Sequence, residues 1–342
     1  MDKIKYKYLK SEVGYVDKTP GKTYGDNNGE IFNNLEENIA SGDCSHAEGY
    51  RTMASGIDSH AEGYETVASG MYSHAEGFNT TASGARSHAE GYKTKATNYD
   101  CHAEGWSTIA SGSYGSHAEG DSTTASGTSS HAEGYNTKAT STNDSVSTTS
   151  TTGKGYYTHA EGYGTVAYGR CSHAEGNGTK ASGIDSHAEG YLTKAYGQAS
   201  HAEGNYTTVS GIYSHAEGDH TTASIQASHA EGYYTTASGQ GSHAEGNYTT
   251  ASGQVSHAEG GNRNSSGGAL SDRTITLSDG STVTIQGSTA AGIQSHAEGT
   301  QTYADGYSSH AEGYMTTASG EYSHAEGNGT KAFDDASHAE GW

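Results

Sequence analysis

The sequence predicts an all-β fold: a parallel β-roll, or solenoid, in which each 14-residue coil holds two short strands. The main observation is a repeat. The tetrad His-Ala-Glu-Gly occurs 19 times, and successive tetrad histidines are 14 residues apart at all but three steps. The chain has 20 histidines, and only His220 lies outside the tetrad. A short fixed period of this kind is typical of a solenoid, whose coils bury their faces against neighbouring coils.

The pattern of small residues predicts the two strands of each coil. Residues 45–49 read Ser-His-Ala-Glu-Gly, and residues 52–56 read Thr-Met-Ala-Ser-Gly. Because side chains alternate along a strand, Ser, Ala and Gly of the first and Thr, Ala and Gly of the second would face inward. His46 and Glu48 would then face outward. A helix is disfavoured, since glycine recurs twice in every coil and costs about 1 kcal/mol against alanine.

Composition limits what such a roll can bury. Leu, Ile, Val and Phe number 27 of 342 residues, and the formal net charge is −22, values typical of disorder. The repeat outweighs that reading, because stacked coils pair their backbone groups in continuous ladders. With little more than alanine methyls inside, a lone roll is expected to be poorly stable, and we predict that another surface covers the His/Glu face. An acidic chain has no electrostatic reason to bind nucleic acid, and three distant cysteines imply no disulfide framework.

The chain divides into four predicted parts. Residues 1–37 do not repeat; Lys3–Leu9 alternates like an edge strand, residues 29–37 suit a short helix, and the segment is a candidate cap or attachment point for a partner. Residues 38–260 form the β-roll. Residues 261–287 are an insertion, and residues 288–342 continue the roll to an uncapped end. No secretory signal and no apolar run long enough for membrane insertion is expected.

Two irregularities interrupt the period. Between His131 and His159 the spacing doubles, and we interpret residues near 141–158 as a degenerate coil, with a 14-residue loop as the alternative. In the insertion, Thr274–Leu277 and Thr282–Ile285 flank an Asp-Gly turn and predict an antiparallel hairpin. We expect this hairpin to project outside the rod.

The outward histidines and glutamates are the candidate trimer-core ladder. Two interpretations stay open: His–Glu hydrogen bonds across chains, which we favour, or a metal site, since imidazole and carboxylate suit zinc. So many copies argue for a scaffold over catalysis, so no enzyme activity and no cofactor is expected. The ladder residues are His46, Glu48, His60, Glu62, His74, Glu76, His88, Glu90, His102, Glu104, His117, Glu119, His131, Glu133, His159, Glu161, His173, Glu175, His187, Glu189, His201, Glu203, His215, Glu217, His229, Glu231, His243, Glu245, His257, Glu259, His296, Glu298, His310, Glu312, His324, Glu326, His338 and Glu340.

A ladder of ion pairs has a consequence for pH. Each histidine that gains a carboxylate would have a raised pKa, and each glutamate a lowered one. Stability would then peak between about pH 4.5 and 6.5.

Candidate receptor contacts come from two places. The residue after the tetrad glycine is aromatic in 11 of 19 copies; these rings could bind glycans, or stack on one another and cover the edge of the roll, which we favour. The hairpin offers four apolar side chains on one face. The candidate residues are Tyr50, Tyr64, Trp106, Tyr135, Tyr191, Ile275, Leu277, Val283 and Ile285.

The order Thr-x-Ala-Ser-Gly-x-x-Ser-His-Ala-Glu-Gly resembles the haemagglutinin-type repeat of trimeric autotransporter adhesin heads. The resemblance covers residues 38–342 apart from the hairpin. It implies a left-handed parallel β-roll in a three-chain rod, with the positions of His46 and Glu48 facing the partner chains. That family has two apolar residues where this chain has His and Glu. Ser-His-Ala-Glu-Gly arrays also look like those in tail-fibre proteins of phages that infect Gram-positive bacteria.

The expected function is therefore a non-enzymatic shaft of a phage tail fibre or similar host-contacting appendage, located on the virion or otherwise extracellular. The first alternative is a bacterial trimeric surface adhesin that binds a cell-surface glycan or protein receptor. A second alternative is a solenoid that binds ice or metal.

Overall fold

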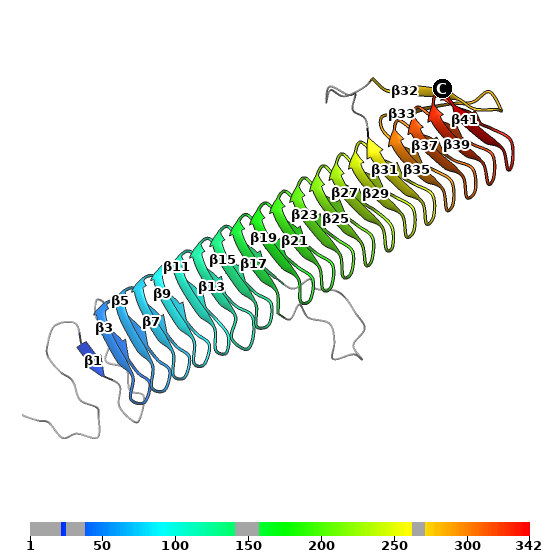
Figure 1. The fold of residues 1–342 in the computed structure, drawn as a ribbon. Coiled ribbons are helices and arrows are strands. Elements are labelled where there is room, and N and C mark those ends of the chain that lie inside the picture. The colour runs from blue at the N-terminus through cyan, green and yellow to red at the C-terminus, as the bar shows by residue number, and fades with distance from the viewer. Residues whose placement is uncertain (1–21, 25–37, 141–156, 262–270) are drawn as a thin grey trace, which may run out of the picture. The chain divides into compact units, whose positions relative to one another are not determined.

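The computed structural model describes residues 22–24, 38–140, 157–261 and 271–342. The chain forms two compact units, residues 1–164 and 165–342. In each unit, successive 14-residue coils stack and contribute one longer and one shorter strand (Figure 1). The all-β parallel solenoid with two strands per coil is therefore confirmed.

The strands of the first unit begin with the short β1 (Lys22–Tyr24). Its longer coil strands are β3 (His46–Tyr50), β5 (His60–Tyr64), β7 (His74–Phe78), β9 (His88–Tyr92), β11 (His102–Trp106), β13 (His117–Asp121), β15 (His131–Tyr135) and β17 (His159–Tyr163). Its shorter coil strands are β2 (Ile39–Ala40), β4 (Met53–Ala54), β6 (Val67–Ala68), β8 (Thr81–Ala82), β10 (Lys95–Ala96), β12 (Ile109–Ala110), β14 (Thr124–Ala125) and β16 (Lys138–Ala139).

The second unit repeats the scheme and adds the hairpin β32 (Arg273–Thr276) and β33 (Thr282–Ile285). Its longer strands are β19 (His173–Asn177), β21 (His187–Tyr191), β23 (His201–Asn205), β25 (His215–Asp219), β27 (His229–Tyr233), β29 (His243–Asn247), β31 (His257–Gly261), β35 (His296–Thr300), β37 (His310–Tyr314), β39 (His324–Asn328) and β41 (His338–Gly341). Its shorter strands are β18 (Val166–Ala167), β20 (Lys180–Ala181), β22 (Lys194–Ala195), β24 (Thr208–Val209), β26 (Thr222–Ala223), β28 (Thr236–Ala237), β30 (Thr250–Ala251), β34 (Thr289–Ala290), β36 (Tyr303–Ala304), β38 (Thr317–Ala318) and β40 (Lys331–Ala332).

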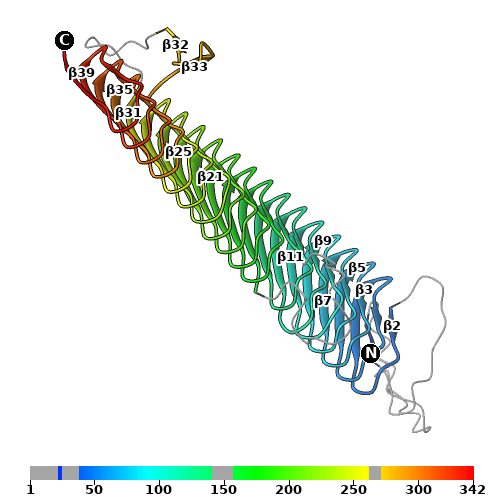
Figure 2. The same ribbon diagram turned by 90° about the vertical axis from the view of Figure 1, so that its right-hand side faces the viewer.

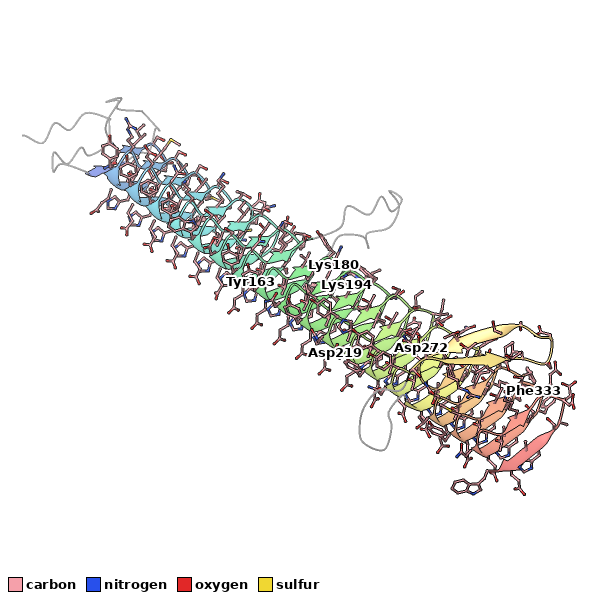
Figure 3. The ribbon with its side chains drawn as sticks, turned by 90° about the horizontal axis from the view of Figure 1, so that it is seen from above. Tyr163, Lys180, Lys194, Asp219, Asp272 and Phe333 are labelled. Atoms are coloured by element: carbon pink, nitrogen blue, oxygen red, sulfur yellow. The ribbon has the colours of Figure 1, made fainter. Side chains whose placement is uncertain are left out.

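The coils stack in register, so equivalent residues lie directly above one another. His60 pairs with His74 and Glu62 with Glu76 between β5 and β7. The shorter strands pair in the same way: Lys180 lies opposite Lys194 across β20 and β22 (Figure 3). This register places every chemical group of the repeat in a row along the unit.

The interior contains the small residues that alternation predicts. Before the last coil, the inward alanines are buried, most of them completely, and so are the inward serines and threonines. The serine hydroxyl donates a hydrogen bond to the glycine carbonyl three residues earlier, as from Ser59 to Gly56 at 2.7 Å. At Gly56 a Cβ would lie 1.9 Å from the carbonyl oxygen of Gly70, so only glycine fits beside the next coil.

The tetrad glycine corrects one expectation. Gly49 does not face inward; it is exposed and has φ of +122°. A Cβ there would also lie 2.0 Å from the carbonyl oxygen of Gly63. Glycine is needed at this place because the backbone turns the corner, which ends at Arg51 with φ of 54°. The second corner of the coil ends in the same left-handed conformation at Asp58.

The two irregularities resolve differently. β15 pairs directly and in register with β17, so no coil lies between them, and the predicted degenerate coil near residues 141–158 is wrong. Most of that segment lies outside the described residues. At the insertion, β31 likewise pairs directly with β35, and β32 pairs antiparallel with β33 as predicted.

The roll begins near residue 38, as predicted, because Ile39 and Ala40 of β2 already pair in register with Met53 and Ala54 of β4. In the non-repeating segment, β1 pairs antiparallel with β3, the first longer strand. β1 therefore occupies the edge of β3 that no coil covers. The predicted strand Lys3–Leu9 and the predicted helix at residues 29–37 lie outside the described residues.

Candidate functional site: the histidine and glutamate ladder

The tetrad histidines form continuous ring stacks. Adjacent imidazoles in the first unit lie 4.7–5.0 Å apart between ring centroids, from His46 to His159. In the second unit, the spacing is 4.6–4.9 Å from His173 to His338. The parallel register imposes this spacing, since it equals the distance between hydrogen-bonded strands.

In most tetrads the imidazole faces the glutamate two residues later on the same strand. His117 Nε2 lies 3.5 Å from Glu119 Oε2, and His243 Nε2 lies 3.7 Å from Glu245 Oε2. Similar pairs at 3.5–4.0 Å recur along both units. These distances are longer than a normal N–H···O hydrogen bond. The favoured His–Glu hydrogen-bond ladder is therefore not formed between these partners within one chain; whether it forms across chains stays a prediction.

The ladder is half-buried even in the single chain. The side chains of His243 and Glu245 are 35% and 37% exposed, while the Nε2 atom of His243 itself is buried. One sheet face thus carries a row of imidazole nitrogens and carboxylates in partial contact with solvent.

The pKa directions in a single chain are opposite to those that the sequence led us to expect for the histidines. Burial lowers the pKa of His102, His187 and His243, and the adjacent stacked histidines lower it further. The pKa values of some glutamates in neighbouring coils depend on one another. A side-chain hydrogen bond with Glu90, followed by burial, raises the pKa of Glu104 to about 7.

The pKa of Glu90 is shifted in the opposite direction to that of Glu104. Hydrogen bonds from Glu104 and Glu76 lower its pKa, whereas the pKa of Glu76 is raised by its hydrogen bond with Glu90. The carboxyl groups of Glu76, Glu90 and Glu104 therefore share protons instead of all ionising together.

The aromatic corner residues stack on one another. In the first unit Tyr50, Tyr64, Phe78, Tyr92 and Trp106 form one stack, with 4.0–5.1 Å between ring centroids. The candidate contacts Tyr50, Tyr64, Trp106, Tyr135 and Tyr191 are all exposed, at 39–53%. Stacking covers the faces of the rings inside the row and leaves their edges to solvent, as the edge-covering interpretation requires.

The hairpin residues require a correction. Ile275 and Ile285 are only 2% and 5% exposed, because they pack on Tyr303 of β36. Leu277 and Val283 are partly buried against the same cluster. Through these side chains the hairpin packs on the second unit instead of projecting freely, and Figure 2 shows β32 and β33 beside the last coils. Ile275 and Ile285 therefore cannot contact a receptor in this state.

Sequence reasoning missed the residues that hold the hairpin. Arg273 donates hydrogen bonds to the carbonyl oxygens of Gln301 and Thr316 and to Thr317 Oγ1. Gln301 is completely buried and donates to the carbonyls of Ser271 and Gln286. The sequence does contain a signal for these contacts. Gln301 and Tyr303 are unusually large for their positions, and they lie in the coil that follows the insertion.

A second ring row was also missed. Tyr206, His220, Tyr234 and Tyr248 are spaced by 14 residues and stack at 4.4–5.0 Å between centroids. The side chain of His220 contacts that of Asp219. The 14-residue spacing could have revealed this row, because it places His220 in register with three tyrosines.

Several of these coils match a known protein family. A family model described as the YadA head domain repeat, in two copies, matches residues 47–73, 118–137 and 230–256. The coils at these three stretches are similar to YadA head repeats. This finding confirms the resemblance to adhesin heads that the sequence indicates. A comparison with curated proteins finds no match.

The YadA-type repeat agrees with the geometry of both units, because each matched stretch spans coil strands and corners. Within the part of the chain that the structure describes, no helix is long and apolar enough to cross a membrane.

Proposed function

We propose that this chain is a non-enzymatic, homotrimeric segment of a surface adhesin head, with its His/Glu ladder facing the partner copies. The observation that carries the proposal is the match of three stretches to the YadA head repeat. This match favours the adhesin over the tail-fibre shaft that the sequence first suggests.

The packing supports assembly. The interior of each roll holds mainly alanine, serine and threonine, so a coil buries little apolar area by itself. The ladder face is flat, in register and half-buried before any partner covers it. The other sheet of the second unit is covered by the hairpin at Tyr303, whereas the described part of the chain places no element over the ladder face, which is therefore open to copies of this chain.

Light scattering on the purified chain tests the trimer. We expect a mass of three times 35.3 kDa. A variant with Glu203, Glu217 and Glu231 changed to Arg should fall to a single copy, because positive charges would meet at the interface. The matched control changes Thr208, Thr222 and Thr236 to Arg on the opposite sheet and should remain trimeric. A ladder variant that keeps the wild-type mass would show that this face is not the interface.

The receptor and the attachment point belong to the same proposal. The exposed edges of the corner aromatics are the surface we assign to a glycan or protein receptor, and residues 1–37 to the cap or attachment partner. Tail-fibre placement remains the second candidate, favoured by the replacement of two apolar residues by His and Glu. Immunolabelling of intact source cells and of released virions separates the two, since an adhesin labels the cell surface.

A further inference from the structure

We propose that the ladder binds divalent transition-metal ions of the zinc class, each held by Nε2 atoms from two consecutive coils and one glutamate carboxylate. All three ligands come from one chain, so the inference goes beyond the proposed assembly and does not depend on it.

The ligand sets recur within each unit. His117, Glu119 and His131 each offer one ligand atom, and these atoms lie within 4.8 Å of one another. The same holds for His229, Glu231 and His243, and for His243, Glu245 and His257. Two imidazoles and a carboxylate form a zinc ligand set that leaves a fourth position open.

The imidazole nitrogens are available. The Nε2 atoms of His117, His131, His229, His243 and His257 are buried and have no hydrogen-bond partner among the described residues. A buried nitrogen without a partner costs free energy, and coordination to a cation would remove that cost. Nitrogen donors select zinc, cobalt, nickel or copper over magnesium or calcium, which prefer oxygen.

The ladder can close on an ion with side-chain motion alone. Ligand atoms on one tetrahedral zinc lie about 3.3 Å apart, closer than the 4.8 Å limit of these sets. The rings of His229 and His243 are 4.6 Å apart and already tilted by 21°. Rotation about the broad terminal torsion of each histidine can bring the nitrogens together, and Glu231 is exposed and free to follow.

The charges favour a cation between coils. The glutamates repeat once per coil in register, as Glu217 opposite Glu231 and Glu231 opposite Glu245. Carboxylates at strand spacing repel one another. A doubly charged ion between two coils offsets that repulsion without any lysine or arginine, neither of which occurs in the tetrad.

The geometry sets the number of ions. Each Nε2 has one lone pair and can bind one ion, so only alternate intervals of the ladder can fill. The first unit has eight tetrad histidines and the second has eleven, which allows four and five ions. We therefore expect nine ions per chain at saturation, whereas independent imidazoles would bind 19.

Two triple variants test this pairing. Changing His187, His215 and His243 to Gln leaves His201 and His229 without neighbouring ladder histidines, and the second unit should keep two ions, for a total of six. Changing His173, His187 and His201 to Gln removes the same number of imidazoles but leaves eight consecutive histidines, for a total of eight. His220→Gln, outside the ladder, should bind nine like the wild type.

The experiment is calorimetric titration of the untagged, chelator-treated full chain with zinc chloride, with the visible absorption of bound cobalt as an independent count. Circular dichroism checks that each variant keeps its β-structure. Magnesium should bind to none of them. Equal losses in the two triple variants, a zinc stoichiometry unaffected by either, or no zinc binding by the wild type would each overturn the proposal. Because counts are per chain, a trimer that fails to form leaves the result interpretable.

Discussion

At the residue scale, the interior of the roll is polar as well as small. The inward threonines are buried, and the Oγ1 atom of Thr235 has no hydrogen-bond partner in the described part of the chain. The inward serines differ, because Ser242 Oγ donates to the Gly239 carbonyl oxygen at 2.7 Å. Two hydroxyls on facing strands of one coil thus have opposite energetic roles.

This difference can be measured by urea unfolding. Thr235→Val keeps the shape and removes an unpaired buried hydroxyl, so we expect it to raise the free energy of unfolding by about 1 kcal/mol. Ser242→Ala is the matched control and should lower it by about 1 kcal/mol, because it removes the hydroxyl donor to the Gly239 carbonyl oxygen, which keeps only the longer bond from the Ser242 N–H at 3.2 Å. If Thr235→Val destabilises instead, the threonine hydroxyl has a partner, such as an internal water, that stabilises the coil.

At the element scale, the hairpin shows how an insertion is held on a solenoid. Its apolar face packs on Tyr303, and Arg273 reaches carbonyl oxygens of two neighbouring coils. Burial lowers the pKa of Arg273 to about 10, so the guanidinium still carries its charge at neutral pH. Its hydrogen bonds are therefore charge-assisted, the stronger kind.

Arg273→Ala should release the hairpin from the coils. We expect amide hydrogen exchange of residues 273–285 to become faster, because the substitution removes three hydrogen bonds to a charged group, each worth about 1.5–3 kcal/mol. Thr276→Ala, on the exposed face of β32, should leave that exchange nearly unchanged. Equal exchange in both variants would mean that the Ile275, Ile285 and Tyr303 cluster holds the hairpin by itself.

At the scale of the whole molecule, the ladder controls the response to pH. In a single chain the pKa of histidines such as His215 is lowered, so these residues do not destabilise the fold above about pH 6.5. As the pH drops below that value, the free energy of unfolding decreases, because the unfolded chain takes up protons more readily than the folded one. The raised pKa of Glu104 acts in the opposite direction. Its contribution is complete below about pH 4.5 and is lost as pH rises toward the folded value of about 7.

We therefore expect the melting temperature of the single chain to be lowest between about pH 4.5 and 6.5, where both effects are unfavourable. The measurement is thermal unfolding from pH 4 to 9 with chelator present, at protein concentrations too low for the copies to assemble. Variants with His187, His201 and His215 changed to Gln should lose part of the acid-side decline. A maximum in this window would indicate instead that carboxylates of other copies face the imidazoles, as an inter-chain ladder predicts.

The sequence by itself determined the period, the two strands per coil and most of the inward residues. Strict repetition forces equivalent residues into register, and alternation then assigns Ala47 and Ala54 to the interior without any tertiary information. It also located the hairpin, because the Asp-Gly turn and the flanking alternation are local signals.

Tertiary structure decided what depends on contacts between coils. The direct pairing of β15 with β17 is a long-range choice that doubled spacing does not specify. The position of Gly49 follows from how the backbone turns a corner beside Gly63, not from residue size. The docking of Ile275 depends on a single tyrosine at the next coil surface. The lowered pKa of His243 arises from burial and from rings stacked on both sides, and these are properties of the assembled ladder that no single coil possesses.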